Sequence, residues 1–161
     1  YDMARWVNAN LDETRRYGID ASLTWSRRSL GLVSVIYHYV DARFSAGPND
    51  GNEVPLVPAH VVTVRGELEL PFDLAALAAV HGVSDQHLGN DNENVGPKLA
   101  SYGTLDLGLR YRPHQLADFD LLAGVDNVFD HVYANSGYLY GKDSYYPAPG
   151  RTWKLTASYR F

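Results

Sequence analysis

The clearest pattern of hydrophobic and polar positions lies in the last eleven residues of the chain. From Trp153 to Phe161 every second side chain is apolar or aromatic, and the side chains between them are polar. Alternation with a period of two predicts a β-strand with one apolar and one polar face. An aromatic last residue is unusual in a soluble protein, because chain ends normally fray. The pattern therefore favours a strand with lipid on one face and a water-filled lumen on the other.

The same alternation recurs along the chain and predicts seven strands in all. They cover residues 16–26, 31–43, 60–70, 74–84, 102–111, 119–129 and 151–161. In the sixth strand, we expect Phe129 on the apolar face and Asp126 on the polar face. The segment 74–84 is the weakest case, because it is apolar on both faces and rich in alanine. Its periodicity also allows a short helix, and we expect a strand because the neighbouring segments require one.

The connections between the predicted strands alternate in length. Three are short, at residues 26–31, 71–73 and 112–118. Three are long, polar and rich in Gly, Asn, Asp and Pro, at residues 45–58, 85–99 and 131–150. Short turns on one side and long loops on the other are typical of bacterial outer-membrane β-barrels, whose short turns are periplasmic. We therefore expect an all-β, antiparallel transmembrane β-barrel with every long loop outside the cell.

Composition agrees with a barrel and excludes several other classes. The longest aliphatic run, residues 74–80, is far shorter than the ~20 residues of a spanning helix. Twelve Tyr, three Trp and five Phe are enough for interfacial girdles, although tyrosine is favoured in any β-rich protein. The net charge is −5 and no basic stripe is present, which argues against a nucleic-acid partner. The chain has no cysteine, so disulfides and thiolate metal sites are excluded.

Several short motifs follow one another along the predicted strands. They are Asp-Glu-Thr-Arg-Arg-Tyr-Gly-Ile-Asp at 12–20, Val-Pro-Leu-Val-Pro-Ala-His at 54–60, Ala-Gly-Val-Asp-Asn-Val-Phe-Asp at 123–130 with Tyr-Ala at 133–134, Tyr-Tyr-Pro-Ala-Pro-Gly-Arg-Thr-Trp at 145–153, and Ser-Tyr-Arg-Phe at 158–161. In this order they resemble the C-terminal part of TonB-dependent outer-membrane receptors. The resemblance covers about residues 8–161. Each motif alone is a modest signal, and their order on strands of matching polarity makes it strong.

The resemblance implies a 22-strand barrel closed around an N-terminal plug, with a short TonB-contacting box ahead of the plug. Seven strands cannot close such a barrel, and two open edges in lipid would leave unpaired backbone groups at several kcal/mol each. We therefore expect residues 1–161 to be the C-terminal segment of the barrel domain, with the plug absent from this chain. Such a chain could be a fragment, a separately numbered piece or one half of a split receptor.

The resemblance also implies a transport role in the bacterial outer membrane. The expected substrate is a scarce nutrient, a ferric siderophore ahead of haem, cobalamin or another metal chelate, and the energy is relayed through the TonB complex. Phe161 resembles the signal by which the barrel-assembly machinery recognises its clients. We expect no cofactor and no catalysis, because no Ser-His-Asp order, paired-carboxylate motif or phosphate-binding loop occurs.

Candidate ligand contacts lie in the long loops. The six histidines are scattered and lack the spacing of metal ligands, so we expect no resident metal site. His87 and His131 are the two histidines in predicted outer loops and could touch a metal chelate or haem. Tyr133, Tyr138 and Tyr140 could stack on a catecholate or a macrocycle through their flat faces. Packing at the barrel rim is the competing explanation for these tyrosines.

Two other classes of protein are compatible with the length of the chain. A small closed eight-strand barrel, an outer-membrane enzyme or a structural anchor, fits 161 residues. The odd number of strands and the receptor-like motifs argue against it. A soluble lipocalin-like binder would turn its apolar face inward and would remain soluble without detergent.

Overall fold

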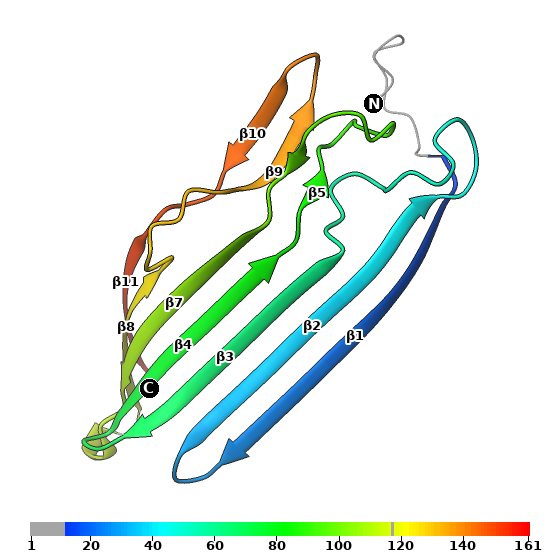
Figure 1. Ribbon diagram of the computed structural model, residues 1–161. Coiled ribbons are helices and arrows are strands. Elements are labelled where there is room, and N and C mark those ends of the chain that lie inside the picture. The colour runs from blue at the N-terminus through cyan, green and yellow to red at the C-terminus, as the bar shows by residue number, and fades with distance from the viewer. Residues whose placement is uncertain (1–11, 117) are drawn as a thin grey trace.

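The computed structural model describes residues 12–116 and 118–161, and the chain forms one antiparallel sheet of seven long strands (Figure 1). The strands lie in the order β1-β2-β3-β4-β7-β8-β11, so each long strand pairs with the next one along the chain. Their bounds are β1 Thr14–Arg27, β2 Gly31–Phe44, β3 His60–Leu70, β4 Leu74–Val83, β7 Tyr102–Tyr111, β8 Phe119–Asp126 and β11 Thr152–Tyr159. The first motif of the receptor resemblance begins at residue 12, and the part of that resemblance over residues 8–11 lies outside the described residues.

All seven predicted strands are present, including the ambiguous segment after residue 74, which is β4. The prediction that the sixth strand reaches Phe129 is wrong, because β8 ends at Asp126. Asn127 has a φ of 50°, and its side-chain amide both donates to and accepts from the backbone of His131 at 2.9 Å. This turn leaves Phe129 outside the ladder with 77% of its surface exposed.

The long loops contain four short strands that the alternation did not predict. They form two hairpins, β5 Gln86–His87 with β6 Lys98–Leu99, and β9 Ala134–Leu139 with β10 Asp143–Pro147. Two-residue strands are too short to show a period, and residues 134–147 mix glycine, serine and tyrosine without a regular apolar face. Figure 1 shows the β9–β10 hairpin standing at the end of the sheet.

Short turns and long loops lie at opposite ends of the sheet, as predicted (Figure 1). The turns after β1 and β3 lie at the same end as the connection between β7 and β8. That connection contains the 3₁₀-helix η1, His114–Leu116. The Asp73 carboxylate accepts the backbone N–H of His114 at 3.0 Å and also pairs with its ring. No helix among the described residues is long and apolar enough to cross a membrane.

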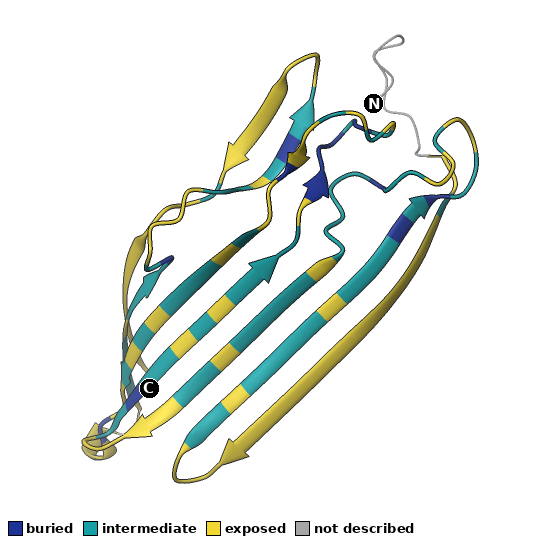
Figure 2. Ribbon diagram, in the orientation of Figure 1, coloured by how far each residue is buried: buried dark blue, intermediate teal, exposed yellow. Residues whose placement is uncertain are grey.

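The two faces of the sheet differ as the alternation predicts. Charged and small side chains of the polar positions line a groove on one face, whereas large apolar side chains are exposed on the other. Trp153 is 77% exposed and Leu23 70% exposed. β1 and β11 form the two edges of the sheet and are exposed along nearly their whole length (Figure 2). Over the described residues the seven strands therefore do not close into a small barrel.

The buried side chains gather mainly at the long-loop end of the molecule (Figure 2). Ala42 and Phe44, at the end of β2, form a hydrophobic cluster with Val54 of the first long loop. Leu88, in the second long loop, is completely buried. A single-layered sheet cannot bury either of its own faces, and so the loops supply the only well-packed core within residues 12–116 and 118–161.

Candidate functional site

The grooved face of the sheet is a wall of paired charges. Arg110 of β7 lies 3.6 Å from Glu67 of β3 and 3.5 Å from Asp120 of β8, and Arg112 donates to Asp120 at 3.0 Å. Lys154 of β11 pairs with Asp126. The groove encloses about 460 Å³, and several leucine side chains line it beside these ion pairs.

A second hollow, of about 320 Å³, lies on the same face nearer the long loops. His81 of β4 lies at its centre, 3.4 Å from Asp106 and 3.3 Å from the hydroxyl of Thr63. Asp106 also accepts the backbone N–H of Asn127 at 2.8 Å, which ties the end of β8 to β7. Tyr102 and Tyr133 line the hollow as well, so it offers aromatic faces, hydroxyls and carboxylates together.

The two tyrosines that line this hollow belong to a stack of three rings. Tyr102 of β7 stacks on Tyr133 with ring centroids 4.2 Å apart, and Tyr133 stacks on His131 at 6.1 Å. The structure thus brings together two of the candidates from the sequence, His131 and Tyr133. Tyr102 was missed, because it begins a regular strand and its place beneath the third long loop depends on tertiary contacts.

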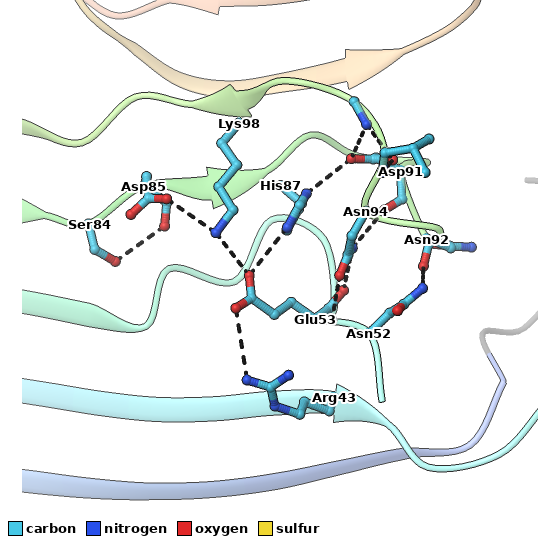
Figure 3. Close-up of polar contacts among 12 residues, drawn as sticks. Arg43, Asn52, Glu53, Ser84, Asp85, His87, Asp91, Asn92, Asn94 and Lys98 are labelled. Atoms are coloured by element: carbon cyan, nitrogen blue, oxygen red, sulfur yellow. Dashed lines mark hydrogen bonds and ion pairs between the residues drawn. The ribbon is translucent and has the colours of Figure 1, made fainter. Parts of the chain in front are cut away.

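The three long loops, which we define as residues 45–59, 84–101 and 127–151, are joined to each other. The first and second loops meet where Asn94 donates to the backbone oxygen of Glu53 at 3.0 Å and accepts the Glu53 N–H at 2.6 Å. The backbone N–H of Leu56 donates to the oxygen of His87 at 3.0 Å. Asn52 donates to the backbone oxygen of Asn92 at 2.9 Å (Figure 3).

The second and third loops are joined by backbone pairing at one glycine. The Gly89 N–H donates to Gly137 at 2.9 Å, and the Gly89 oxygen accepts the N–H of Leu139 at 2.8 Å. A Cβ at Gly89 would lie 2.3 Å from the ring of Tyr138, so only glycine allows this approach. We call the three joined loops the loop cap.

The other predicted site residues lie within the loop cap. Tyr138 stacks on Tyr140 at 5.8 Å and meets Tyr146 edge-on at 5.9 Å, so these three rings form a cluster on the β9–β10 hairpin. Tyr140 and Tyr146 are about half exposed. His87 differs, because its side chain is only 8% exposed. It lies between Asp91 and Glu53 in the interior of the cap (Figure 3).

An ion-pair network surrounds Glu53. Lys98 lies 3.1 Å from Glu53 and 3.2 Å from Asp85. The hydrogen bond that Lys98 donates to Glu53, supported by the one to Asp85, raises the pKa of Lys98 above its ordinary value of 10.5 against the opposing effect of burial. A cation with a raised pKa contributes stability that is complete below pH 10.5 and is lost as pH rises through the folded-state pKa. Within the described residues, no group of three or more histidines and carboxylates is arranged to hold a metal ion.

The sequence also matches a known family. Residues 1–128 match the family described as TonB dependent receptor-like, beta-barrel. The chain belongs to this family of TonB-dependent receptors. Its members are non-enzymatic transporters of the bacterial outer membrane, which is where this chain resides. No curated protein matches the chain.

Solved structures of TonB-dependent receptors superpose on most of the chain. The siderophore receptor PiuA from Acinetobacter baumannii is 20% identical with a TM-score of 0.76, and the match covers 91% of this chain and 22% of PiuA. The ferric citrate transporter FecA is 21% identical with a TM-score of 0.77, over 92% of this chain and 24% of FecA. The copper transporter OprC is 22% identical with a TM-score of 0.72, over 92% and 24%.

The chain therefore spans less than a quarter of the length of these three receptors. At such identities the likeness establishes the fold of an antiparallel barrel segment. The three receptors act on a siderophore, on ferric citrate and on copper, as their descriptions state, so family membership alone does not fix a substrate.

Proposed function

We propose that this chain is part of an active-transport receptor that takes up a scarce nutrient, a ferric siderophore, across the outer membrane. The observation that carries the proposal is the polar, grooved wall capped at one end by joined aromatic loops, in a chain of the TonB-dependent receptor family. Such a wall offers a water-filled path, and the cap offers flat rings at its entrance. The likeness to PiuA, a siderophore receptor, and to FecA, a ferric citrate transporter, supports the substrate class.

The remaining parts of the receptor follow from this proposal. Residues 1–161 form the C-terminal segment of the barrel domain, and the plug and the TonB-contacting box belong to a part outside this chain. TonB contacts the receptor through that part, and the barrel-assembly machinery contacts it through the last strand and Phe161. An intact mass of the purified polypeptide well above 17.9 kDa would support this division. A mass of 17.9 kDa without a companion chain would contradict it.

We place the ligand contacts on the exposed side of the loop cap. Tyr133 lines the hollow and carries His131 on its ring, and Tyr138 and Tyr140 present rings on the β9–β10 hairpin. An aromatic contact of this kind contributes about 0.5–1.5 kcal/mol beyond the area that it buries. Replacing Tyr133 by alanine should therefore weaken ligand binding up to roughly tenfold through the lost stacking alone. Of the sequence candidates, His87 has the least exposed surface for a direct contact.

Uptake in whole cells tests the proposal. A strain without the receptor gene, grown under iron limitation, should lose accumulation of a radioactive ferric siderophore, and the whole receptor should restore it. The same strain without TonB should show no uptake even when the receptor is present. Restored uptake of copper, with unchanged uptake of every ferric chelate tried, would contradict the siderophore assignment and leave the family assignment intact.

A further inference from the structure

His87 has a carboxylate oxygen at each of its two ring nitrogens. Nδ1 lies 3.0 Å from Oδ2 of Asp91, and Nε2 lies 3.3 Å from Oε2 of Glu53 (Figure 3). A neutral imidazole has one N–H donor and one lone pair, so it can donate to only one of the two carboxylates. Its lone pair then faces the other carboxylate. The doubly protonated imidazolium donates to both, and this is the one protonation state that satisfies the whole geometry.

The carboxylate of Asp91 is fixed in place by its own loop. Its oxygens accept the backbone N–H groups of Val95 at 3.0 Å and of Gly96 at 3.1 Å, and its side chain is 1% exposed. An anion that accepts several backbone N–H bonds cannot turn away from the imidazole when the proton leaves. The position of the Asp91 carboxylate beside the ring is therefore fixed by the fold and does not depend on the protonation state of the ring.

The network around His87 holds more negative than positive groups. Two cations lie in the network, Lys98 at 3.1 Å and Arg43 at 3.9 Å from Glu53. They face four carboxylates: Glu53, Asp91, Asp85 on Lys98 and Asp41 on Arg43. Two positive charges against four negative ones leave an excess of negative charge, which an imidazolium reduces. In a partly buried site this attraction is less screened than at the surface.

The two carboxylates belong to different loops. Asp91 is in the same loop as His87, whereas Glu53 is in the first long loop, 34 residues earlier in the chain. The contact from Nε2 to Glu53 thus crosses the junction between the loops, alongside the hydrogen bonds of Asn94 and Leu56. Those neighbouring bonds involve groups that do not titrate near neutral pH. The His87–Glu53 contact differs from them, because it includes an imidazole, whose second nitrogen can take up a proton.

We propose that His87 is a proton-dependent latch between the first and second long loops. When the ring takes up a proton, it donates to Glu53 as well as to Asp91 and draws the two loops together. When the proton leaves, the repulsion between the ring lone pair and Glu53 loosens the junction. The latch would make the loop cap stiffer in acid surroundings and more open in neutral or alkaline ones. It stands on the local geometry and does not depend on which substrate the receptor carries.

Hydrogen exchange of the complete receptor, in lipid nanodiscs, tests the latch. Amide exchange in peptides covering residues 52–57 and 86–96 would be measured at pH 5.5 and pH 8.0 and corrected for the intrinsic exchange rate at each pH. The gain of one charge-assisted hydrogen bond should slow exchange roughly fivefold at pH 5.5 relative to pH 8.0. Equal corrected rates at the two pH values would overturn the proposal.

Two variants and a matched control make the assignment specific to His87. His87→Gln removes the titrating ring, and Glu53→Gln supplies an amide that can donate to or accept from either ring form. Both variants should fold, shown by unchanged exchange in β3 and β4, and both should lose the pH difference. His38→Gln is the control, because His38 also faces an aspartate, Asp20 at 2.5 Å, but lies in the sheet. The control should keep the full difference, and a difference retained in His87→Gln would refute the latch.

Discussion

At the scale of single residues, backbone conformation decides which positions tolerate a side chain. Gly31 begins β2 with a φ of +128°, a conformation that L-residues with a side chain rarely adopt. A Cβ at this position would lie 1.9 Å from the backbone oxygen of Glu67 on the neighbouring strand. Gly66, the neighbour of Glu67, is different, because a Cβ there meets no atom within 4 Å. A side chain is therefore excluded at Gly31 but has space at Gly66, although the two glycines belong to paired strands.

Gly31→Ala should destabilise the barrel, and Gly66→Ala should not. The alanine at 31 combines backbone strain with a clash against a strand backbone, at a cost of about 3 kcal/mol. Urea unfolding of the purified receptor in lipid vesicles measures the difference as a shift in the transition midpoint. If both variants unfolded at the same urea concentration as the native protein, the strain assigned to Gly31 would be wrong.

Asp73 offers a second residue-scale prediction, based on pH. The backbone N–H of His114, with its ring, holds the pKa of the Asp73 carboxyl below its ordinary value of 3.8. A depressed pKa means that the carboxylate contributes stability above pH 3.8, which is lost as pH falls through the folded-state pKa. The native receptor should therefore be more stable than Asp73→Asn at pH 6, and this advantage should shrink below pH 4. Urea midpoints of both proteins at several pH values would show it, and an advantage independent of pH would contradict it.

At the scale of elements, packing explains why β4 lacks the apolar–polar alternation of the other long strands. β4 is apolar on both faces because Ala75 lies on the grooved face, where it is 5% exposed and opposite Arg110 in the register. A small side chain there leaves room for the Arg110 guanidinium to reach across β4 to Glu67. Ala78 pairs with Leu107 in the register, so it belongs to the opposite face, and it is exposed.

Ala75→Leu should therefore disturb the sheet, whereas Ala78→Leu should be tolerated. The larger side chain at 75 overfills the space beside Arg110 and displaces it from Glu67, at a cost of about 1–3 kcal/mol. The same change at 78 extends into the apolar surroundings of the other face. Folding yield into lipid vesicles, compared between the two variants, is the measurement. A larger loss for Ala78→Leu than for Ala75→Leu would reverse the assignment of the two faces.

The strands were predictable from the sequence because their signal is local, and the parts that were missed depend on distant contacts. Six of the seven strands carry a period of two within themselves, and the seventh, β4, was assigned because its neighbours require a strand. β5 and β9 are different, since each exists through pairing with another segment of a loop. The end of β8 was misplaced because Phe129 continues the apolar alternation, although the turn at Asn127 has already ended the ladder.

At the scale of the whole molecule, the three long loops are joined by hydrogen bonds, and the seven long strands form one continuous sheet. The sequence placed His87 in an outer loop but could not show that Glu53 of another loop would cover it. The sorting of long loops to one end was predictable, because antiparallel neighbours alternate direction and so every second connection lies at the same end. The hollow lined by Tyr102 and Tyr133 could not be predicted, because β7 and the third loop meet only after the sheet has formed.

We expect the apolar face of the sheet to meet lipid and the grooved face to meet the lumen. Placing one charge on each face tests this assignment. In the register Leu107 of β7 belongs to the apolar face, where it is 45% exposed, whereas Thr156 of β11 pairs with Leu122 on the face of Arg110. An arginine at a lipid-facing midplane position costs about 2–4 kcal/mol, because the charge must leave water, whereas a lumenal position is solvated. Leu107→Arg should thus make folding into lipid vesicles less favourable by about 3 kcal/mol. Thr156→Arg should change it by less than about 1 kcal/mol. Equal folding of the two variants would mean that the apolar face does not meet lipid, and the alternation along the strands would then need another explanation.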